Sequence, residues 1–184
     1  IAFASPLAWA ATWEPALAAR AAEMVARETA AVGINWTFAP MVDLSRDPRW
    51  GRVIEGAGED PVLAAAMARA RVEGYRRGGL ATAVKHFVGY GAAEAGRDYN
   101  GARIPMSELY DRYLPPFEAA IAAGSETVMA AFNTVNGVPV SSSRELLSDL
   151  LRRRLGFDGL VTSDYNAIGE LINHGVAADP GEAA

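Results

Sequence analysis

The 184-residue sequence contains no cysteine, only two histidines, and no hydrophobic run that approaches the roughly 20 residues needed to span a bilayer. The lack of cysteine excludes disulfide bonds, thiolate metal sites and a cysteine nucleophile, although it leaves the cellular compartment undecided. Two histidines do not favour a metal site, and we expect neither a metal ion nor another cofactor. We also expect no membrane span.

Basic residues are fewer than acidic ones: the sequence has 17 Lys and Arg and 22 Asp and Glu, which gives a net charge of -5. This sign is opposite to that of surfaces that bind a phosphate backbone, so we expect no nucleic-acid partner. With 51% hydrophobic and 21% charged residues, the composition is that of an ordinary globular protein. These properties do not predict the oligomeric state.

Apolar periodicity alternates between the helical and the strand repeat along the chain, without a change in composition that would mark a second domain. Asp60 followed by Pro61 is a strong start signal for a helix, and Pro115 is expected to kink or divide another one. We expect helices over residues 14–32, 62–77, 107–123, 143–155 and 166–173, and strands over residues 35–40, 80–87, 127–132 and 160–163. The sequence therefore predicts an α/β fold with about four strands alternating with helices.

Short apolar strands separated by helices are typical of parallel βαβ units, which occur both in barrels and in open doubly wound sheets. Long loops follow three of the expected strands, over residues 41–59, 88–105 and 133–142. Loops of this kind form the active sites of barrel enzymes, so they favour the barrel. An eight-stranded barrel typically takes about 250 residues, and we therefore expect a partial (β/α)8 TIM-type barrel.

Polar side chains follow two of these strands directly. The last strand leads into Ser163, Asp164 and Tyr165, and the second strand leads into Lys85 and His86. Because the carboxyl ends of parallel strands meet at one edge of a sheet, we expect Asp164, Lys85 and His86 to face a common hollow. From the residues alone, Asp164 is equally well explained as the cap of the following helix. For Lys85 and His86 the residues alone favour a lysine that reaches to the surface from a strand end and a core histidine with satisfied hydrogen bonds.

Several motifs occur in an order and spacing that resemble glycoside hydrolase family 3, and within it the bacterial β-glucosidases of the periplasmic type. The motifs are FAPMVD at 38–43, RDPRWGR at 46–52, EDP at 59–61, KHFVGYGA at 85–92, AFN at 131–133, NGVP at 136–139, GFDG at 156–159 and SDY at 163–165. The resemblance covers nearly the whole chain. It implies that residues 1–184 are a fragment of that family's N-terminal (β/α)-barrel domain, with the C-terminal α/β sandwich domain absent.

The resemblance also assigns roles to individual residues. It implies that Asp164 is the nucleophile of a retaining hydrolysis, in which a second carboxyl group protonates the leaving oxygen about 5–5.5 Å away. Lys85 and His86 correspond to the family's paired sugar-binding residues, which follow one another across a cis peptide bond. Arg52 corresponds to a third sugar contact, where a guanidinium grips vicinal hydroxyls; the alternative is a solvated surface arginine.

Apolar and aromatic residues complete the expected sugar pocket. Met129 and Phe132 fall where relatives line the glucose pocket, although core packing explains Met129 equally well. Tyr165 and Trp50 are expected to stack on the sugar ring. Other loop residues have a structural interpretation, since Arg46 and Arg49 are expected to pair with carboxylates of their own loop, at Asp43, Asp47 or Glu55.

The implied function is that of an exo-acting retaining β-glucosidase acting on a small-molecule carbohydrate, in the periplasm or outside the cell. The alternatives are a β-xylosidase of the same family and a non-catalytic carbohydrate-binding remnant. Two family residues have no counterpart here: the carboxylate for the distal sugar hydroxyls would precede Ile1, and the general acid would follow Ala184. We therefore expect the isolated fragment to be inactive.

Overall fold

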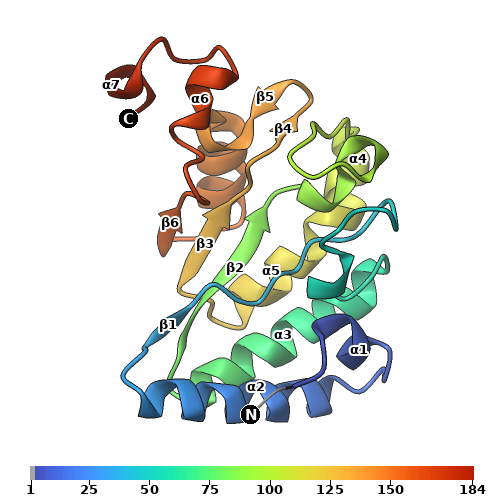
Figure 1. Cartoon of the computed structure of the whole chain (residues 1–184). Coiled ribbons are helices and arrows are strands. Elements are labelled where there is room, and N and C mark those ends of the chain that lie inside the picture. Colours follow the sequence, from blue (N-terminus) through green and yellow to red (C-terminus); the bar gives the residue numbers. More distant parts are fainter. Residues whose placement is uncertain (1–2) are drawn as a thin grey trace.

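A computed structural model describes residues 3–184 (Figure 1). Its main sheet has four strands in the order β1-β2-β3-β6, and every neighbouring pair is parallel. The strands are β1 (Trp36–Thr37), β2 (Ala81–Phe87), β3 (Thr127–Ala130) and β6 (Leu160–Thr162). Helices lie between successive strands, so the predicted α/β fold with four alternating strands is confirmed.

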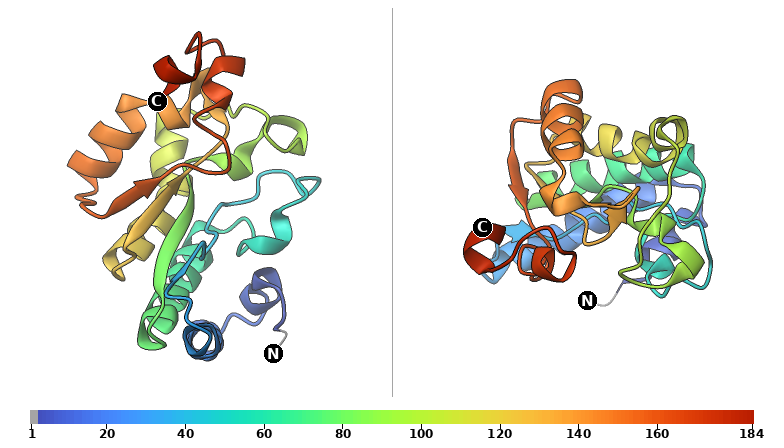
Figure 2. Two further views of the ribbon diagram at one scale, coloured as in Figure 1. Left: turned by 60° about the vertical axis from the view of Figure 1, so that its left-hand side comes forward. Right: turned by 90° about the horizontal axis from the view of Figure 1, so that it is seen from above.

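The long helices begin and end at local signals that are readable in the sequence. They are α2 (Pro15–Ala31), α3 (Pro61–Arg77) and α5 (Pro115–Ala122). The side chain of Asp60 accepts a hydrogen bond of 2.7 Å from the N–H of Leu63, and Pro61 occupies the first helical turn. These helices lie on the same side of the sheet, and α3 and α5 both contact β2 (Figure 2).

Shorter elements fill the connections. They are α1 (Pro6–Ala10), η1 (Val53–Glu55), η2 (Tyr90–Ala92), η3 (Glu94–Gly96), α4 (Met106–Glu108), η4 (Leu109–Tyr113), the hairpin of β4 (Thr134–Val135) and β5 (Val138–Pro139), η5 (Val140–Ser142), η6 (Glu145–Arg154), α6 (Glu170–Asn173) and α7 (Pro180–Ala183). Of these, η4 and η6 are π-helical and the other η elements are 3-10 turns. Most of these short elements lie in the loops that follow the strands.

Two predicted helices differ from the observed ones. The helix expected over 107–123 is divided just before Pro115, whose ring removes a backbone donor. The helix expected over 166–173 covers only α6, because Asn166 has a left-handed φ of 53° and residues 165–169 form turns. The strand expected over 35–40 is also shorter, since Pro40 cannot donate to a strand ladder.

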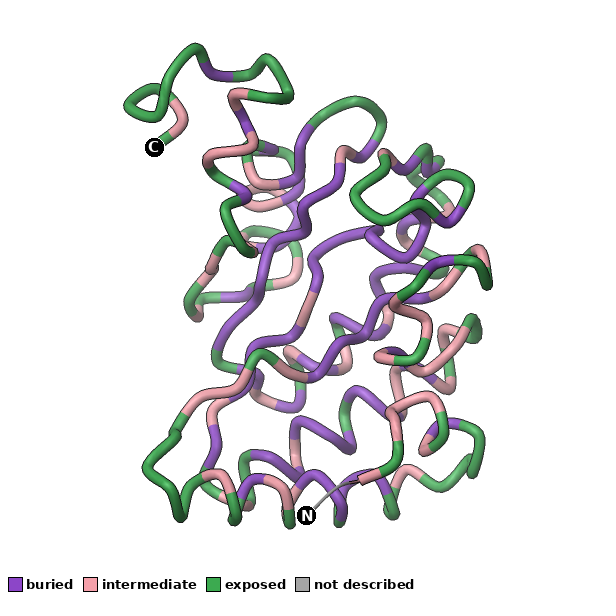
Figure 3. Tube along the Cα trace, viewed as in Figure 1, coloured by how far each residue is buried: buried purple, intermediate pink, exposed green. Residues whose placement is uncertain are grey.

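The hydrophobic core lies between the sheet and the helices. Val84, Phe87, Leu114, Phe117 and Leu151 are fully buried there, and the rings of Phe87 and Phe117 meet edge to face at 5.2 Å. The central strands are buried along their length, whereas the outer strands are partly exposed (Figure 3). Within residues 3–184, no helix is long and apolar enough to cross a membrane.

Candidate active site

The loop after β1 folds back over the carboxyl end of β2. Val42 donates its N–H to the carbonyl oxygen of Lys85 at 2.8 Å, and Arg46 donates its N–H to that of Gly91 at 2.9 Å. Gly91 permits this approach, because a Cβ on it would lie 2.1 Å from the carbonyl oxygen of Leu44. The loop thereby brings its polar side chains to the edge of the sheet where β2 and β6 also end.

Three side chains form a chain of contacts across this edge. His86 lies between Asp43 and Asp164: its Nδ1 is 2.7 Å from Asp43 Oδ2, and its Nε2 is 3.3 Å from Asp164 Oδ2. The His86 and Asp43 side chains are each 1% exposed, and that of Asp164 is 15% exposed. The expectation that Asp164 and His86 converge is confirmed.

The two carboxylate oxygens of Asp164 differ in their partners. Oδ1 accepts the N–H of Tyr165 at 2.7 Å, whereas Oδ2 is buried and has no hydrogen-bond partner among residues 3–184, because the contact with His86 is not aligned as a hydrogen bond. Asp164 does not cap the following helix, since α6 begins only at Glu170. The unpaired oxygen is thus the one that faces His86.

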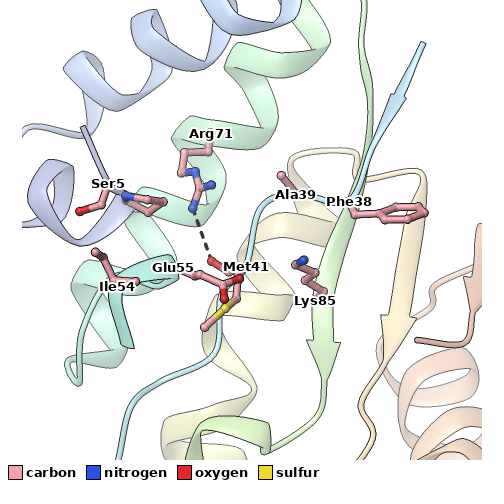
Figure 4. Close-up of a pocket in the computed structure, with 9 residues that line it drawn as sticks. Ser5, Phe38, Ala39, Met41, Ile54, Glu55, Arg71 and Lys85 are labelled. Atoms are coloured by element: carbon pink, nitrogen blue, oxygen red, sulfur yellow. Dashed lines mark hydrogen bonds between the residues drawn. The ribbon is translucent and has the colours of Figure 1, made fainter. Parts of the chain in front are cut away.

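Lys85 is partly buried among charged groups. Burial and the charge of Arg52 lower the pKa of Lys85 below its usual value. The carboxylates of three residues act in the opposite direction and so lie near the ammonium group: Glu55, Asp164 and Asp43. Lys85 and Glu55 also line a pocket of about 280 Å³ between the β1 edge and α3, shown in Figure 4.

Arg52 is held in place from two directions. Its guanidinium donates to both carboxylate oxygens of Glu55, at 2.8 Å and 3.0 Å, and it lies 5.5 Å from the centre of the Tyr90 ring. Hydrogen bonding from Arg52 lowers the pKa of Glu55. The solvated-arginine alternative is therefore wrong for Arg52, which is a fixed cation at the same edge of the sheet.

Tyr90 supports both Arg52 and His86. Its ring meets the His86 ring edge to face at 5.1 Å, and its hydroxyl donates to Asp98 at 2.6 Å. Burial, followed by the hydrogen bond to Asp98, raises the pKa of Tyr90. Trp50 donates its ring N–H to the same carboxylate at 2.9 Å and is 1% exposed. The prediction that Trp50 stacks on a sugar is therefore wrong, because its ring is enclosed by the protein.

Met129 and Tyr165 lie beside these groups in different environments. Met129 is buried in β3 and pairs in register with Lys85 on one side and Thr162 on the other. Tyr165 is 83% exposed next to the carboxylate of Asp164. Phe132 is buried against the rings of Tyr90 and Tyr99. The sugar contacts assigned to Met129 and Tyr165 remain predictions.

The peptide bond between Lys85 and His86 is cis, as the family resemblance predicts. The bond between Phe87 and Val88 is also cis, which the sequence did not indicate. The pairing of β2 with β3 shifts register between Lys85 and Phe87. His86 thus lies within β2 at the point where the regular pairing with β3 is interrupted.

Asp43 and Glu55 were assigned to the wrong partners by sequence reasoning. Arg49 pairs with Asp47 as predicted, but Arg46 pairs with Glu108 at 2.8 Å. Asp43 and Glu55 instead hold His86 and Arg52. The sequence carries a signal for Asp43, since it follows the apolar residues at the end of a strand just as Asp164 does. Residues 3–184 contain no group of three or more His, Asp or Glu side chains that could hold a metal ion.

Comparison with known proteins identifies the family of the chain. Residues 2–184 match the model of the glycosyl hydrolase family 3 N-terminal domain. The chain belongs to glycosyl hydrolase family 3. It is 48% identical over 164 residues to the periplasmic beta-glucosidase of Salmonella typhimurium, covering 86% of this chain and 21% of that protein. It is 44% identical over 192 residues to a beta-xylosidase of Formosa agariphila, covering 97% of this chain and 26% of that protein.

Solved structures of the family give the same result for the fold. The chain superposes on the beta-glucosidase of Listeria innocua in complex with isofagomine with a TM-score of 0.97 and 46% identity, covering 99% of this chain and 27% of that one. The same Listeria enzyme has been solved in complex with glucose. The chain spans about a quarter of the length of these relatives, so this family 3 chain is a fragment that corresponds to part of the barrel domain.

Proposed function

We propose that this chain supplies the nucleophile and part of the glucose pocket of a retaining, exo-acting β-glucosidase. The observation that carries the proposal is the convergence of Asp164, His86, Lys85 and Arg52 at one edge of the sheet. Retaining hydrolysis needs a carboxylate with an oxygen that is not engaged elsewhere; the Asp164 side chain is 15% exposed, and its Oδ2 has no hydrogen-bond partner among residues 3–184. The name of the Salmonella relative supports the glucosidase assignment.

In this proposal, Asp164 attacks the anomeric carbon while a second carboxyl group protonates the leaving oxygen. The reaction passes through an oxocarbenium-like transition state to a glycosyl ester of Asp164, which water then hydrolyses. We expect another domain of the complete protein to supply the second carboxyl group. This chain alone is then expected to bind the sugar without turning it over.

Sugar binding is assigned to two cationic donors at this edge of the sheet. The Lys85 ammonium and the Arg52 guanidinium offer several N–H donors to vicinal hydroxyls. Met129 provides an apolar wall, and the exposed ring of Tyr165 offers a face on which a pyranose can stack. Two charged donors beside a nucleophile match a small polyhydroxylated substrate.

The test of the nucleophile is Asp164→Asn in the protein produced from the complete gene. We expect hydrolysis of an aryl β-glucoside to fall about 10³-fold or more, because the amide cannot form the ester. Asp158→Asn is the matched control, since that carboxylate is exposed just before β6. An activated 2-fluoroglucoside should label the peptide that contains Asp164. Unchanged turnover in pure Asp164→Asn protein, or a label on another residue, would refute the assignment.

A β-xylosidase is the second candidate, because the Formosa relative matches 97% of the chain at 44% identity. Xylose lacks the hydroxymethyl group of glucose, so the two activities are separated by the ratio of kcat/KM for aryl β-glucoside and aryl β-xyloside. We expect the ratio to favour glucoside. We also propose a periplasmic location, following the name of the Salmonella relative, which cell fractionation tests.

A further inference from the structure

We infer that Asp43 is a positioning residue that fixes the orientation and the Nδ1–H tautomer of His86, so that Nε2 faces the carboxylate of Asp164. This inference rests on the proposed function. Asp43 lies on the loop after β1, and its Oδ2 accepts two hydrogen bonds from the same residue: the backbone N–H of His86 at 3.0 Å and its ring Nδ1 at 2.7 Å. His86 is therefore held through both its backbone and its ring.

The hydrogen bond at Nδ1 determines where the histidine proton lies. An ionised carboxylate only accepts hydrogen bonds, so the ring nitrogen facing Asp43 must carry the proton. Nε2 is then the ring nitrogen that faces the edge of the sheet, 3.3 Å from an oxygen of Asp164. In this tautomer Nε2 can accept a hydrogen bond from a sugar hydroxyl.

The surroundings of His86 hold its ring in one place. Carboxylates lie on both sides of the ring, and the Tyr90 ring meets it edge to face at 5.1 Å. Of the two carboxylates, Asp43 is the one that is as deeply buried as His86 and that accepts two hydrogen bonds from it.

The catalytic consequence follows from where Nε2 lies. It lies beside the carboxylate of Asp164, so a sugar hydroxyl that it binds is held next to the attacking group. Asp43 keeps the imidazole in one orientation, as the carboxylate does for histidine in a catalytic triad.

The experiment uses Asp43→Ala in the protein from the complete gene, with Asp47→Ala as the matched control on the same loop. Alanine removes the acceptor of both hydrogen bonds, so the His86 ring is no longer held and either ring nitrogen can carry the proton. We expect kcat per active site, counted by 2-fluoroglucoside labelling, to fall about 10²- to 10⁴-fold. Asp43→Asn is the conservative variant, and we expect it to keep most of the activity because its amide oxygen can still accept both hydrogen bonds.

A double-mutant cycle separates positioning from general destabilisation. In the His86→Gln background, Asp43→Ala should have no further effect on kcat, because the group that Asp43 positions has been removed. The inference is overturned if Asp43→Ala leaves kcat unchanged, or if its effect is the same with and without His86. Those outcomes are compatible with an Asp164-dependent glucosidase. A wild-type protein without glycosidase activity would overturn both proposals.

Discussion

Replacing Gly91 by alanine tests how the loop after β1 is fastened to the site. The added Cβ would lie 2.1 Å from the carbonyl oxygen of Leu44, 2.7 Å from its carbonyl carbon and 3.3 Å from the ring of Trp50. Leu44 is 2% exposed and Trp50 is 1% exposed, so neither can move aside into solvent. The loop must therefore shift away from η2.

The size of the effect follows from two opposing contributions. An ordinary Cβ contact lies at 3.4–4 Å, so the backbones must separate by about 1 Å or more. Overpacking of this kind typically costs about 1–3 kcal/mol, whereas Gly to Ala gains about 0.4–1 kcal/mol by restricting the unfolded chain. The clash is larger, and we expect Gly91→Ala to lower the free energy of unfolding by about 1–2 kcal/mol.

Urea unfolding followed by tryptophan fluorescence measures this change. For a chain of this size, each kcal/mol corresponds to about 2–4 °C in Tm. Gly51→Ala is the matched control, because Gly51 lies in the same loop with no atom within 4 Å of the added Cβ and no left-handed φ. The reasoning is refuted if Gly91→Ala is as stable as the wild type, or if Gly51→Ala loses the same amount.

Three other substitutions test the site and its support. Tyr90→Phe removes one of the two donors to Asp98, and we expect a loss of about 1–2 kcal/mol in urea unfolding, together with a higher KM in the complete protein. Leu151→Ala leaves a cavity in the core and should cost about 2–5 kcal/mol by the same measurement; a smaller loss would contradict its burial. Burial, followed by the charge of Arg52, lowers the pKa of Lys85, so the unfolded chain binds more protons between that lowered pKa and the usual value of 10.5. The free energy of unfolding of the wild type, relative to that of Lys85→Met, should therefore rise with pH across this window. If the two stability curves run parallel, the pKa of Lys85 is not lowered.

The fold was predictable because its signals are local. The cap at Asp60, the apolar repeat of β2 and the glycines after α3 each act within a few residues, and the alternation of strands and helices follows from them. The part of the site that lies at the ends of the strands was predictable for the same reason. Parallel strands carry their carboxyl ends to one edge, so Asp164 and His86 had to lie near one another.

The partners within the loops were not predictable, because they depend on how distant segments fold onto each other. Arg46 pairs with Glu108, which lies 62 residues further along the chain, although nearer carboxylates are available. Trp50 is buried because residues beyond β2 close over it and Asp98 accepts its ring N–H. Neither contact has a local pattern, since each requires the close approach at Gly91.

Asp43 shows where a rule that was available in the sequence was not applied to every strand. Each strand of the main sheet is followed within a few residues by a buried or partly buried polar side chain: Asp43 after β1, Lys85 and His86 at the end of β2, Asn133 after β3 and Asp164 after β6. A polar side chain at that position lies just outside the apolar core but is still surrounded by protein. Its neighbours therefore fix it while it faces the open edge of the sheet. The reasoning that identifies Asp164 therefore applies equally to Asp43, and it would have placed Asp43 beside His86 rather than in an ion pair of its own loop.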